Sequence, residues 1–200
     1  MSKTLLIAGI GNIFLGDDGF GSEVARRLMD RSWPEGVRVV DYGIRGFDVA
    51  FALMDGVDVS ILIDATPQGG SPGTLYIIEP ELADLNDPAV RELPVDTHAM
   101  NPMKVFQLVR AMEGRFKKVL IVGCEPADFG PENEGRLGLS PLVAAAVEEA
   151  IKLIDRLVAE ILAEAAVPAS PLRVSAPPRE TNEDSRGGAE TRREKIASNS

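Results

Sequence analysis

Residues 4–19 of the chain, TLLIAGIGNIFLGDDG, combine a short apolar run, a glycine-rich turn and a pair of acidic residues. The run from Thr4 to Ala8 predicts a buried strand that ends at the glycines. Residues 17–30 carry Phe20, Val24 and Leu28 at four-residue spacing, which predicts one buried face of a helix. A strand, a tight turn and a helix in this order form the first unit of an α/β fold.

The same alternation continues along the chain. Further strands are predicted at 37–40, 57–63, 74–78 and 119–122, and helices at 47–54, at 102–112 and from Pro141 to residue 161. The strand at 74–78 follows a Gly-rich turn and is expected to be antiparallel at an edge. We therefore predict an α/β fold, a three-layer α/β/α sandwich with a mostly parallel, five-stranded twisted sheet and an antiparallel edge strand. Ligands of such sheets bind at the carboxyl ends of the strands.

The composition changes near Pro168. The 33 residues that follow residue 167 are rich in Pro, Ser, Arg and Glu and show no apolar period. This composition is typical of disordered segments. We predict one domain over residues 1–167 and a disordered C-terminal tail over residues 168–200.

Charge and cysteine content narrow the class of protein. The chain has 21 Lys and Arg against 31 Asp and Glu, a net charge of −10, which disfavours binding to nucleic acid. Its single cysteine, Cys124, cannot form an intrachain disulfide and agrees with a reducing compartment. The apolar run at the N-terminus is too short for a signal sequence, and no stretch has the length of a membrane span. A cytoplasmic location without membrane contact is expected.

The glycine-rich turn favours a functional site built on carboxylates over a nucleotide-binding site. A dinucleotide-binding turn has the pattern G-x-G-x-x-G, but Phe14 stands at the third glycine position, and carboxylates before the helix repel phosphate. Asp17 is interpreted as the N-cap of the following helix. Asp18 is a second, adjacent carboxylate, which suggests a functional role with a raised pKa or a metal.

Two further residues complete the candidate site. Asp64 ends a buried apolar run and is either a site residue or a hydrogen-bonded loop aspartate. His98 is the only histidine, and it has either a functional or a structural role. Two carboxylates and an imidazole suit a borderline divalent metal such as nickel or zinc. The chain has no G-x-S-x-G elbow and no H-E-x-x-H helix, and Cys124 is interpreted as a small core or rim residue.

Ordered segments over residues 4–162 resemble the nickel-iron hydrogenase maturation endopeptidases. They are the opening signature at 9–19, the D-x-G-x-x-G loop at 41–46, the strand at 61–65, the histidine His98, and the closing segments at 122–126 and 138–141. Members of this family remove a C-terminal extension from the hydrogenase large subunit after nickel has been inserted. The resemblance implies the same activity here, with the hydrogenase large-subunit precursor as partner and the protease as a monomer.

The resemblance also implies roles for individual residues. Nickel in the substrate would be recognised by Asp18, Asp64 and His98, with no organic cofactor, although the first position is often Glu in the family and is Asp here. Gly43 and Gly46 would let a loop approach the substrate backbone, and Arg45 would contact a carboxylate unless it is a solvated surface charge. Two alternatives remain: a nickel-sensing assembly chaperone that does not cleave, and a Rossmann-like nucleotide-binding module.

Overall fold

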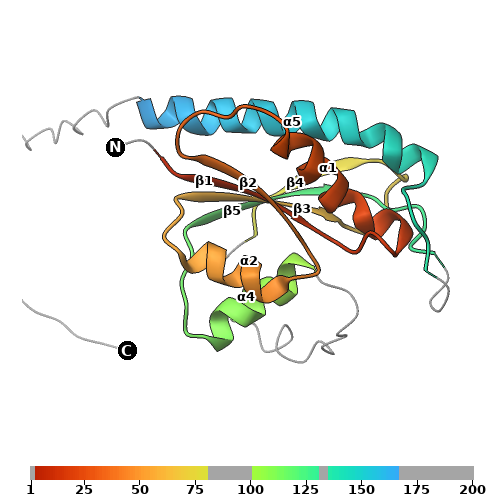
Figure 1. Ribbon diagram of the computed structural model, residues 1–200, viewed down its shortest axis with the longest axis horizontal. Coiled ribbons are helices and arrows are strands. Elements are labelled where there is room, and N and C mark those ends of the chain that lie inside the picture. Colours follow the sequence, from red (N-terminus) through yellow and green to blue (C-terminus); the bar gives the residue numbers. More distant parts are fainter. Residues whose placement is uncertain (1–2, 81–100, 131–134, 167–200) are drawn as a thin grey trace, which may run out of the picture. The chain divides into compact units, whose positions relative to one another are not determined.

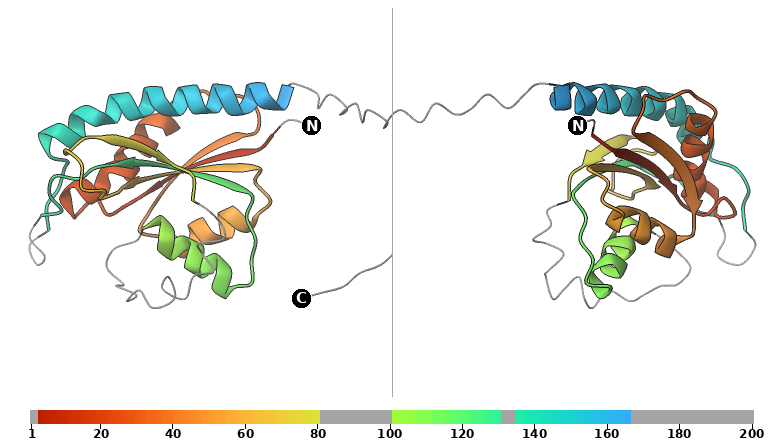
Figure 2. Two further views of the ribbon diagram at one scale, coloured as in Figure 1. Left: turned by 180° about the vertical axis from the view of Figure 1, so that it is seen from behind. Right: turned by 60° about the vertical axis from the view of Figure 1, so that its left-hand side comes forward.

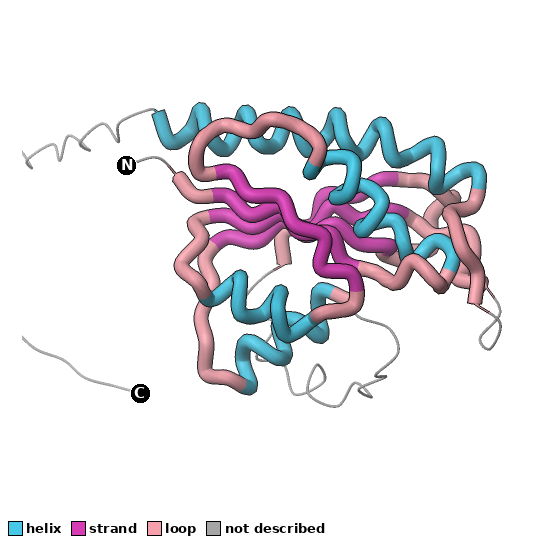
Figure 3. The backbone as a smooth tube through the Cα atoms, viewed as in Figure 1, coloured by secondary structure: helices cyan, strands magenta, loops and turns pink. Residues whose placement is uncertain are grey.

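The computed structural model describes residues 3–80, 101–130 and 135–166, in which a five-stranded sheet lies between layers of helices (Figures 1 and 3). The strands are β1 (Leu5–Ile10), β2 (Val37–Gly43), β3 (Val59–Ala65), β4 (Leu75–Ile78) and β5 (Lys118–Cys124). Their order across the sheet is β2-β1-β3-β5-β4. Only β4 among them pairs antiparallel, at one edge. The predicted fold class is confirmed.

Helices cover both faces of the sheet. They are the short 3-10 helix η1 (Gly16–Gly19) and the α-helices α1 (Phe20–Met29), α2 (Gly46–Met54), α4 (Pro102–Ala111) and α5 (Pro141–Ala166). Helices α1 and α5 lie on one face, and α2 and α4 lie on the other (Figure 2). None of the helices in the described ranges is both long and apolar enough to cross a membrane. The predicted tail, residues 168–200, lies outside the described residues, so the domain boundary stays a prediction.

The central strands explain the continuous apolar runs in the sequence. Alternate residues of a strand point to opposite faces, so Ile61 and Ile63 of β3 belong to the core under α1 and α5, whereas Leu62 belongs to the core under α2 and α4. Strands β1 and β3 are fully buried along their length. A strand covered on both faces needs apolar side chains at every position, which is why no alternation is visible in the sequence.

The parallel strands extend further toward their carboxyl ends than predicted. The sequence pattern ended them at residues 8, 40, 63 and 122, whereas the strands end at Ile10, Gly43, Ala65 and Cys124. The backbone ladder continues through glycine and aspartate, as in the pairs Gly9 with Asp41 and Asp64 with Gly123. Polar and glycine residues interrupt the apolar run and so end the predicted strands, although backbone pairing does not require apolar side chains.

Helix α1 is packed unusually close to the sheet. A Cβ atom on Gly21 would lie 2.1 Å from the carbonyl oxygen of Ile63 and 2.2 Å from that of Ile10. A Cβ on Gly9 would lie 2.4 Å from the carbonyl oxygen of Gly21. Two glycines therefore face each other where α1 crosses β1. Gly9 and Gly21 therefore serve helix-to-strand packing, which accounts for these two glycines without a bound nucleotide.

Replacing Gly21 with alanine is expected to destabilise the fold by about 3 kcal/mol, because two backbone carbonyls cannot move without separating α1 from the sheet. Urea denaturation measures the free energy of unfolding. Gly56→Ala is the control: its φ is +81°, but a Cβ there meets no atom within 4 Å, so only about 1 kcal/mol of backbone strain is expected. Equal losses in the two variants would contradict the close-packing explanation.

Candidate functional site

The candidate site lies at the carboxyl edge of the sheet, where β1, β2, β3 and β5 all end. Four loops follow these strands, and the three after β1, β2 and β5 cover residues 11–15, 44–45 and 125–140, the last with a gap at 131–134 in the described residues. Backbone hydrogen bonds join these loops: Gly11 N–H donates to the Gly43 carbonyl at 3.0 Å, and Arg136 N–H donates to the Phe14 carbonyl at 2.7 Å. The edge is therefore a connected surface formed by three loops.

Asp18 is held beside the end of β1 by the short helix η1. A Cβ on Gly11 would lie 1.9 Å from the Asp18 carbonyl oxygen, so only glycine allows the turn to fold back this closely. The Asp18 carboxylate accepts a hydrogen bond of 2.7 Å from the Asn12 N–H. Burial raises the pKa of Asp18, and the Asn12 hydrogen bond offsets this only in part. Asp18 is thus a buried carboxyl next to a backbone turn.

Asp64 lies on β3, one residue before its end, and is 2% exposed. Burial raises the pKa of Asp64 well above its usual value, and the negative charge of Asp18 raises it further. Its Oδ1 atom is buried and has no hydrogen-bond partner among the described residues. A buried carboxyl oxygen without a partner is costly for folding, which is common at functional sites.

The structure thus brings together two of the three predicted ligands. Asp18 and Asp64 form an electrostatically coupled carboxyl pair at one edge of the sheet. His98 lies outside the described residues. Within the described ranges, no three side chains of the metal-binding types form a cluster. The carboxyl pair would need a further ligand, from outside these ranges or from a substrate, to hold a metal ion.

Asp17 has a different role from the predicted N-cap. Its carboxylate accepts backbone hydrogen bonds from Ala127 at 2.8 Å, Asp128 at 3.0 Å and Ser140 at 2.6 Å. Helix α1 begins after Gly19 without any side-chain cap. The N-cap interpretation was therefore wrong: Asp17 belongs to η1 and fastens both ends of the loop between β5 and α5. Burial alone would raise the pKa of Asp17, but these hydrogen bonds together lower it.

The loop from Gly43 to Gly46 connects β2 to α2 and is stabilised by Arg45. The guanidinium donates to the carbonyls of Tyr42 at 3.0 Å and Asp41 at 2.6 Å, and pairs with Asp48 at 3.5 Å. Gly43 has a φ of +56°, a conformation that favours glycine. The side chain of Arg45 therefore already binds its own loop, and its contact with a substrate stays a prediction.

The sequence analysis did not single out Asp41 and Ser22 as site residues. Asp41, in β2, accepts hydrogen bonds from the Ser22 hydroxyl at 2.8 Å and from the Gly43 N–H at 3.0 Å. Both side chains line two adjoining pockets at the carboxyl edge, of about 470 Å³ and about 310 Å³. The signal for Asp41 was present, because it is a carboxylate near the carboxyl end of a parallel strand, as Asp64 is.

Cys124 is a core residue, which is one of the two positions interpreted from the sequence. It ends β5 and is fully buried. Burial raises the pKa of its thiol to about 12, so the thiolate needed for nucleophilic attack is not formed near neutral pH. The carboxyl pair is the stronger candidate for chemistry at this edge.

The fold and site define an α/β enzyme with two coupled carboxyls at the carboxyl edge of a parallel sheet. A family model described as hydrogenase maturation protease matches residues 22–157. A putative hydrogenase maturation protease of Methanocaldococcus jannaschii is 32% identical over 153 residues, covering 76% of this chain and 94% of the relative. The delta subunit of coenzyme F420 hydrogenase from Methanothermobacter thermautotrophicus is 30% identical over 156 residues, covering 75% of this chain and 91% of the relative.

Solved structures agree with the sequence comparison. The hydrogenase maturating endopeptidase HybD of Escherichia coli superposes with a TM-score of 0.63 at 28% identity, covering 78% of this chain and 93% of that one. A hydrogenase 2 maturation peptidase from a Thaumarchaeota archaeon superposes with a TM-score of 0.58 at 30% identity, covering 78% of this chain and 99% of that one. The chain belongs to the hydrogenase maturation protease family and is a hydrolase of the endopeptidase type. The resemblance seen in the sequence is confirmed.

Proposed function

We propose that this protease removes the C-terminal extension of a nickel-loaded [NiFe] hydrogenase large-subunit precursor. Nickel would be part of the substrate and would be recognised by Asp18, Asp64 and His98. The observation that carries the proposal is the coupled pair of buried carboxyls at the carboxyl edge, with Asp64 Oδ1 unpartnered among the described residues. Because such an arrangement destabilises the fold, a cation supplied by a substrate is its simplest use.

The position of α4 supports His98 as the third ligand. Val105 and Phe106 of α4 pack in the same core as Leu62, on the face of the sheet to which Asp64 belongs by strand alternation. His98 comes four positions before Pro102, the first residue of α4, and that length of chain spans at most ~14 Å. This short connection to α4 is what supports His98 as the third ligand.

Two routes to hydrolysis fit this set of groups. In one, the nickel ion of the substrate polarises the scissile carbonyl or activates water, while Asp18 and Asp64 hold the ion. In the other, one of the two carboxyls acts as the general base and nickel only positions the substrate. A raised pKa brings Asp64 closer to the range in which a carboxyl exchanges protons at working pH.

The loop at Gly43 and Gly46 is proposed to contact the substrate backbone. It borders the pocket of about 310 Å³, which is also lined by Asp41 and Arg45. A location in the cytoplasm and a monomeric state complete the proposal, in line with the single cysteine and the net charge of −10.

A cleavage assay with mass-spectrometric readout tests the proposal. Purified protease is mixed with its large-subunit precursor, with and without inserted nickel, beside a His98→Ala variant. Loss of a C-terminal peptide is expected only from the nickel-loaded precursor, and the variant is expected to cleave at least about tenfold more slowly. Equal cleavage of both precursors would remove nickel from the proposal. Stable binding without any mass change would favour the chaperone alternative.

A further inference from the structure

Large apolar side chains are exposed mainly around the candidate site. Ile13 and Phe14, in the loop after β1, are 50% and 59% exposed, Ile44 after β2 is 58% exposed, and Leu137 after β5 is 73% exposed. We call these four residues the apolar rim. At the opposite edge of the sheet, the connections 30–36, 55–58 and 112–117 contain no exposed large apolar side chain. Single exposed apolar residues are ordinary, but a group at one edge marks an interaction site.

The apolar rim is continuous. Ile13, Phe14 and Ile44 line the pocket of about 310 Å³, and Ile13 with Leu137 lines the pocket of about 470 Å³. The two pockets share Ile13, Ser22 and Asp41, so they adjoin along one side of the site. The four exposed apolar side chains therefore border one continuous hollow at this edge of the sheet.

Backbone hydrogen bonds hold the rim in place. The Gly16 N–H donates to the Arg136 carbonyl at 2.8 Å, which fixes the segment next to Leu137 against the loop with Phe14. The carboxylate of Asp17 fastens the same segment at Ser140. A surface held in this way loses little conformational entropy when it binds a partner.

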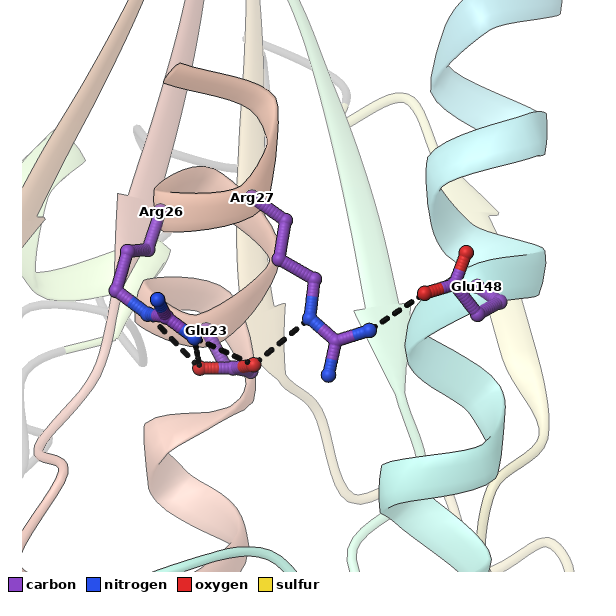
Figure 4. A network of polar contacts seen from close by, with 4 residues as sticks. All are labelled: Glu23, Arg26, Arg27 and Glu148. Carbon is purple, nitrogen blue, oxygen red and sulfur yellow. Dashed lines mark hydrogen bonds and ion pairs between the residues drawn. The ribbon is translucent and has the colours of Figure 1, made fainter. Parts of the chain in front are cut away.

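The charges around the rim determine which polypeptide fits. The arginines that line the pockets are already paired: Arg26 with Glu23, and Arg27 with both Glu23 and Glu148, as Figure 4 shows. Arg45, in the smaller pocket, pairs with Asp48. By contrast, no ion pair is formed by Asp18, Asp41 or Asp64 with any described residue. An acidic segment would therefore be repelled, and a second copy of this chain, also with a net charge of −10, is disfavoured.

We propose that the apolar rim is the docking surface for an extended, apolar segment of the hydrogenase precursor that lacks acidic side chains. This inference rests on the proposed function and adds to it the chemical class of the segment recognised. The rim is continuous with the cleavage site, because Asp18 binds the N–H of Asn12, the residue directly before Ile13. Binding at the rim would place the neighbouring peptide bond at the carboxyl pair.

Steady-state cleavage by the full chain tests this docking surface. Phe14→Ser and Leu137→Ser are each expected to raise KM for the nickel-loaded precursor about tenfold, with kcat within about twofold of the wild type. Met29→Ser is the matched control, because Met29 is 52% exposed but lies at the end of α1 near the opposite edge, and its KM is expected to stay unchanged. Thermal melts of all variants are expected to agree closely, since these side chains are exposed.

The outcomes separate the rim from the proposed function. Cleavage by the wild type with unchanged KM in both rim variants would overturn the docking proposal and leave the protease intact. A monomer–dimer equilibrium that the rim variants abolish would assign the rim to a second copy and also overturn it. If the wild type binds but does not cleave, the Kd of the same variants for the precursor decides: a rise of about tenfold supports the rim although cleavage has failed.

Discussion

Asp64→Asn is expected to lower the rate of precursor cleavage about a thousandfold, whichever of the two routes operates. An amide is a poor ligand for a divalent metal and cannot accept a proton as a carboxylate does. The side chain keeps its size and its place in β3, so the fold is retained. The measurement is kcat/KM for the nickel-loaded precursor, followed by mass spectrometry.

The same substitution is expected to stabilise the folded protein at neutral pH. Because the pKa of Asp64 is raised in the folded state, the wild type binds this proton more tightly when folded, and its stability falls as pH rises above the unfolded pKa of about 4. The asparagine side chain of the variant has no such proton to lose, so the stability of the variant does not fall with pH for this reason. The difference in melting temperature is expected to be small in acid and to grow toward neutral pH, where the charge of Asp18 adds to the effect of burial.

Asp58→Asn is the control, and its expected effect on stability is the opposite of that of Asp64→Asn. Asp58 lies before β3, at the edge away from the site, and accepts hydrogen bonds from the Thr4 N–H at 2.8 Å and from Lys117 at 2.6 Å. Lys117 and Thr4 lower the pKa of Asp58, so its contribution to stability is present at neutral pH and is lost in acid. Its variant should lose stability and keep activity. Full-rate cleavage by Asp64→Asn would remove Asp64 from the mechanism.

The local pattern of the sequence was enough to predict the layers of the fold and part of the site. Apolar runs and four-residue spacings located the strands and helices, because burial requires the same pattern in any α/β sandwich. The rule that ligands bind at carboxyl ends of parallel strands correctly drew attention to Asp64. The same rule applied to Asp41, which directly follows the strand predicted at 37–40 just as Asp64 follows the one predicted at 57–63, but Asp41 was considered only as part of the loop motif at 41–46.

Long-range polar contacts could not be predicted from the sequence. Asp17 matched an N-cap because helix caps are local and common, whereas its partners lie 110 to 123 residues further along the chain. Arg45 was expected to be available for a substrate, yet the carbonyl oxygens of its own turn already accept its hydrogen bonds. Such contacts depend on how loops meet at the edge of the sheet, and residue spacing carries no information about that.

The unequal environments of Asp17 and Asp18 explain why two adjacent acids are compatible with folding. Asp17 accepts three backbone hydrogen bonds and has a lowered pKa, so it stays ionised. Asp18 accepts a hydrogen bond from Asn12, which is too little to offset its burial, and its pKa is raised. The first acid thus stabilises the loops, which leaves the second free for a ligand. The same division predicts that the two acids respond differently to substitution.

Asp17→Ala is expected to destabilise the fold by about 4 kcal/mol, because one buried and two partly buried backbone N–H groups lose an ionised acceptor at once. Asp17→Asn is expected to cost about 2 kcal/mol, since its amide oxygen can still accept from Ala127 and Asp128 while its NH₂ group faces the Ser140 N–H. Urea denaturation at neutral pH measures both losses. Cleavage should also slow, because the segment that carries Leu137 is no longer fastened beside the site.

The matched control for Asp17 is Asp128→Asn, an acid of the same loop. The Asp128 side chain is exposed and pairs with Arg136, so its loss is expected to cost less than about 1 kcal/mol. The pH dependence gives a second check. Because the pKa of Asp17 is lowered in the folded state, its stabilisation is complete at neutral pH and is lost as pH falls below about 5. The wild type and Asp17→Asn should therefore converge in acid; a difference that stays constant down to about pH 3 would mean that the Asp17 charge does not hold the loop.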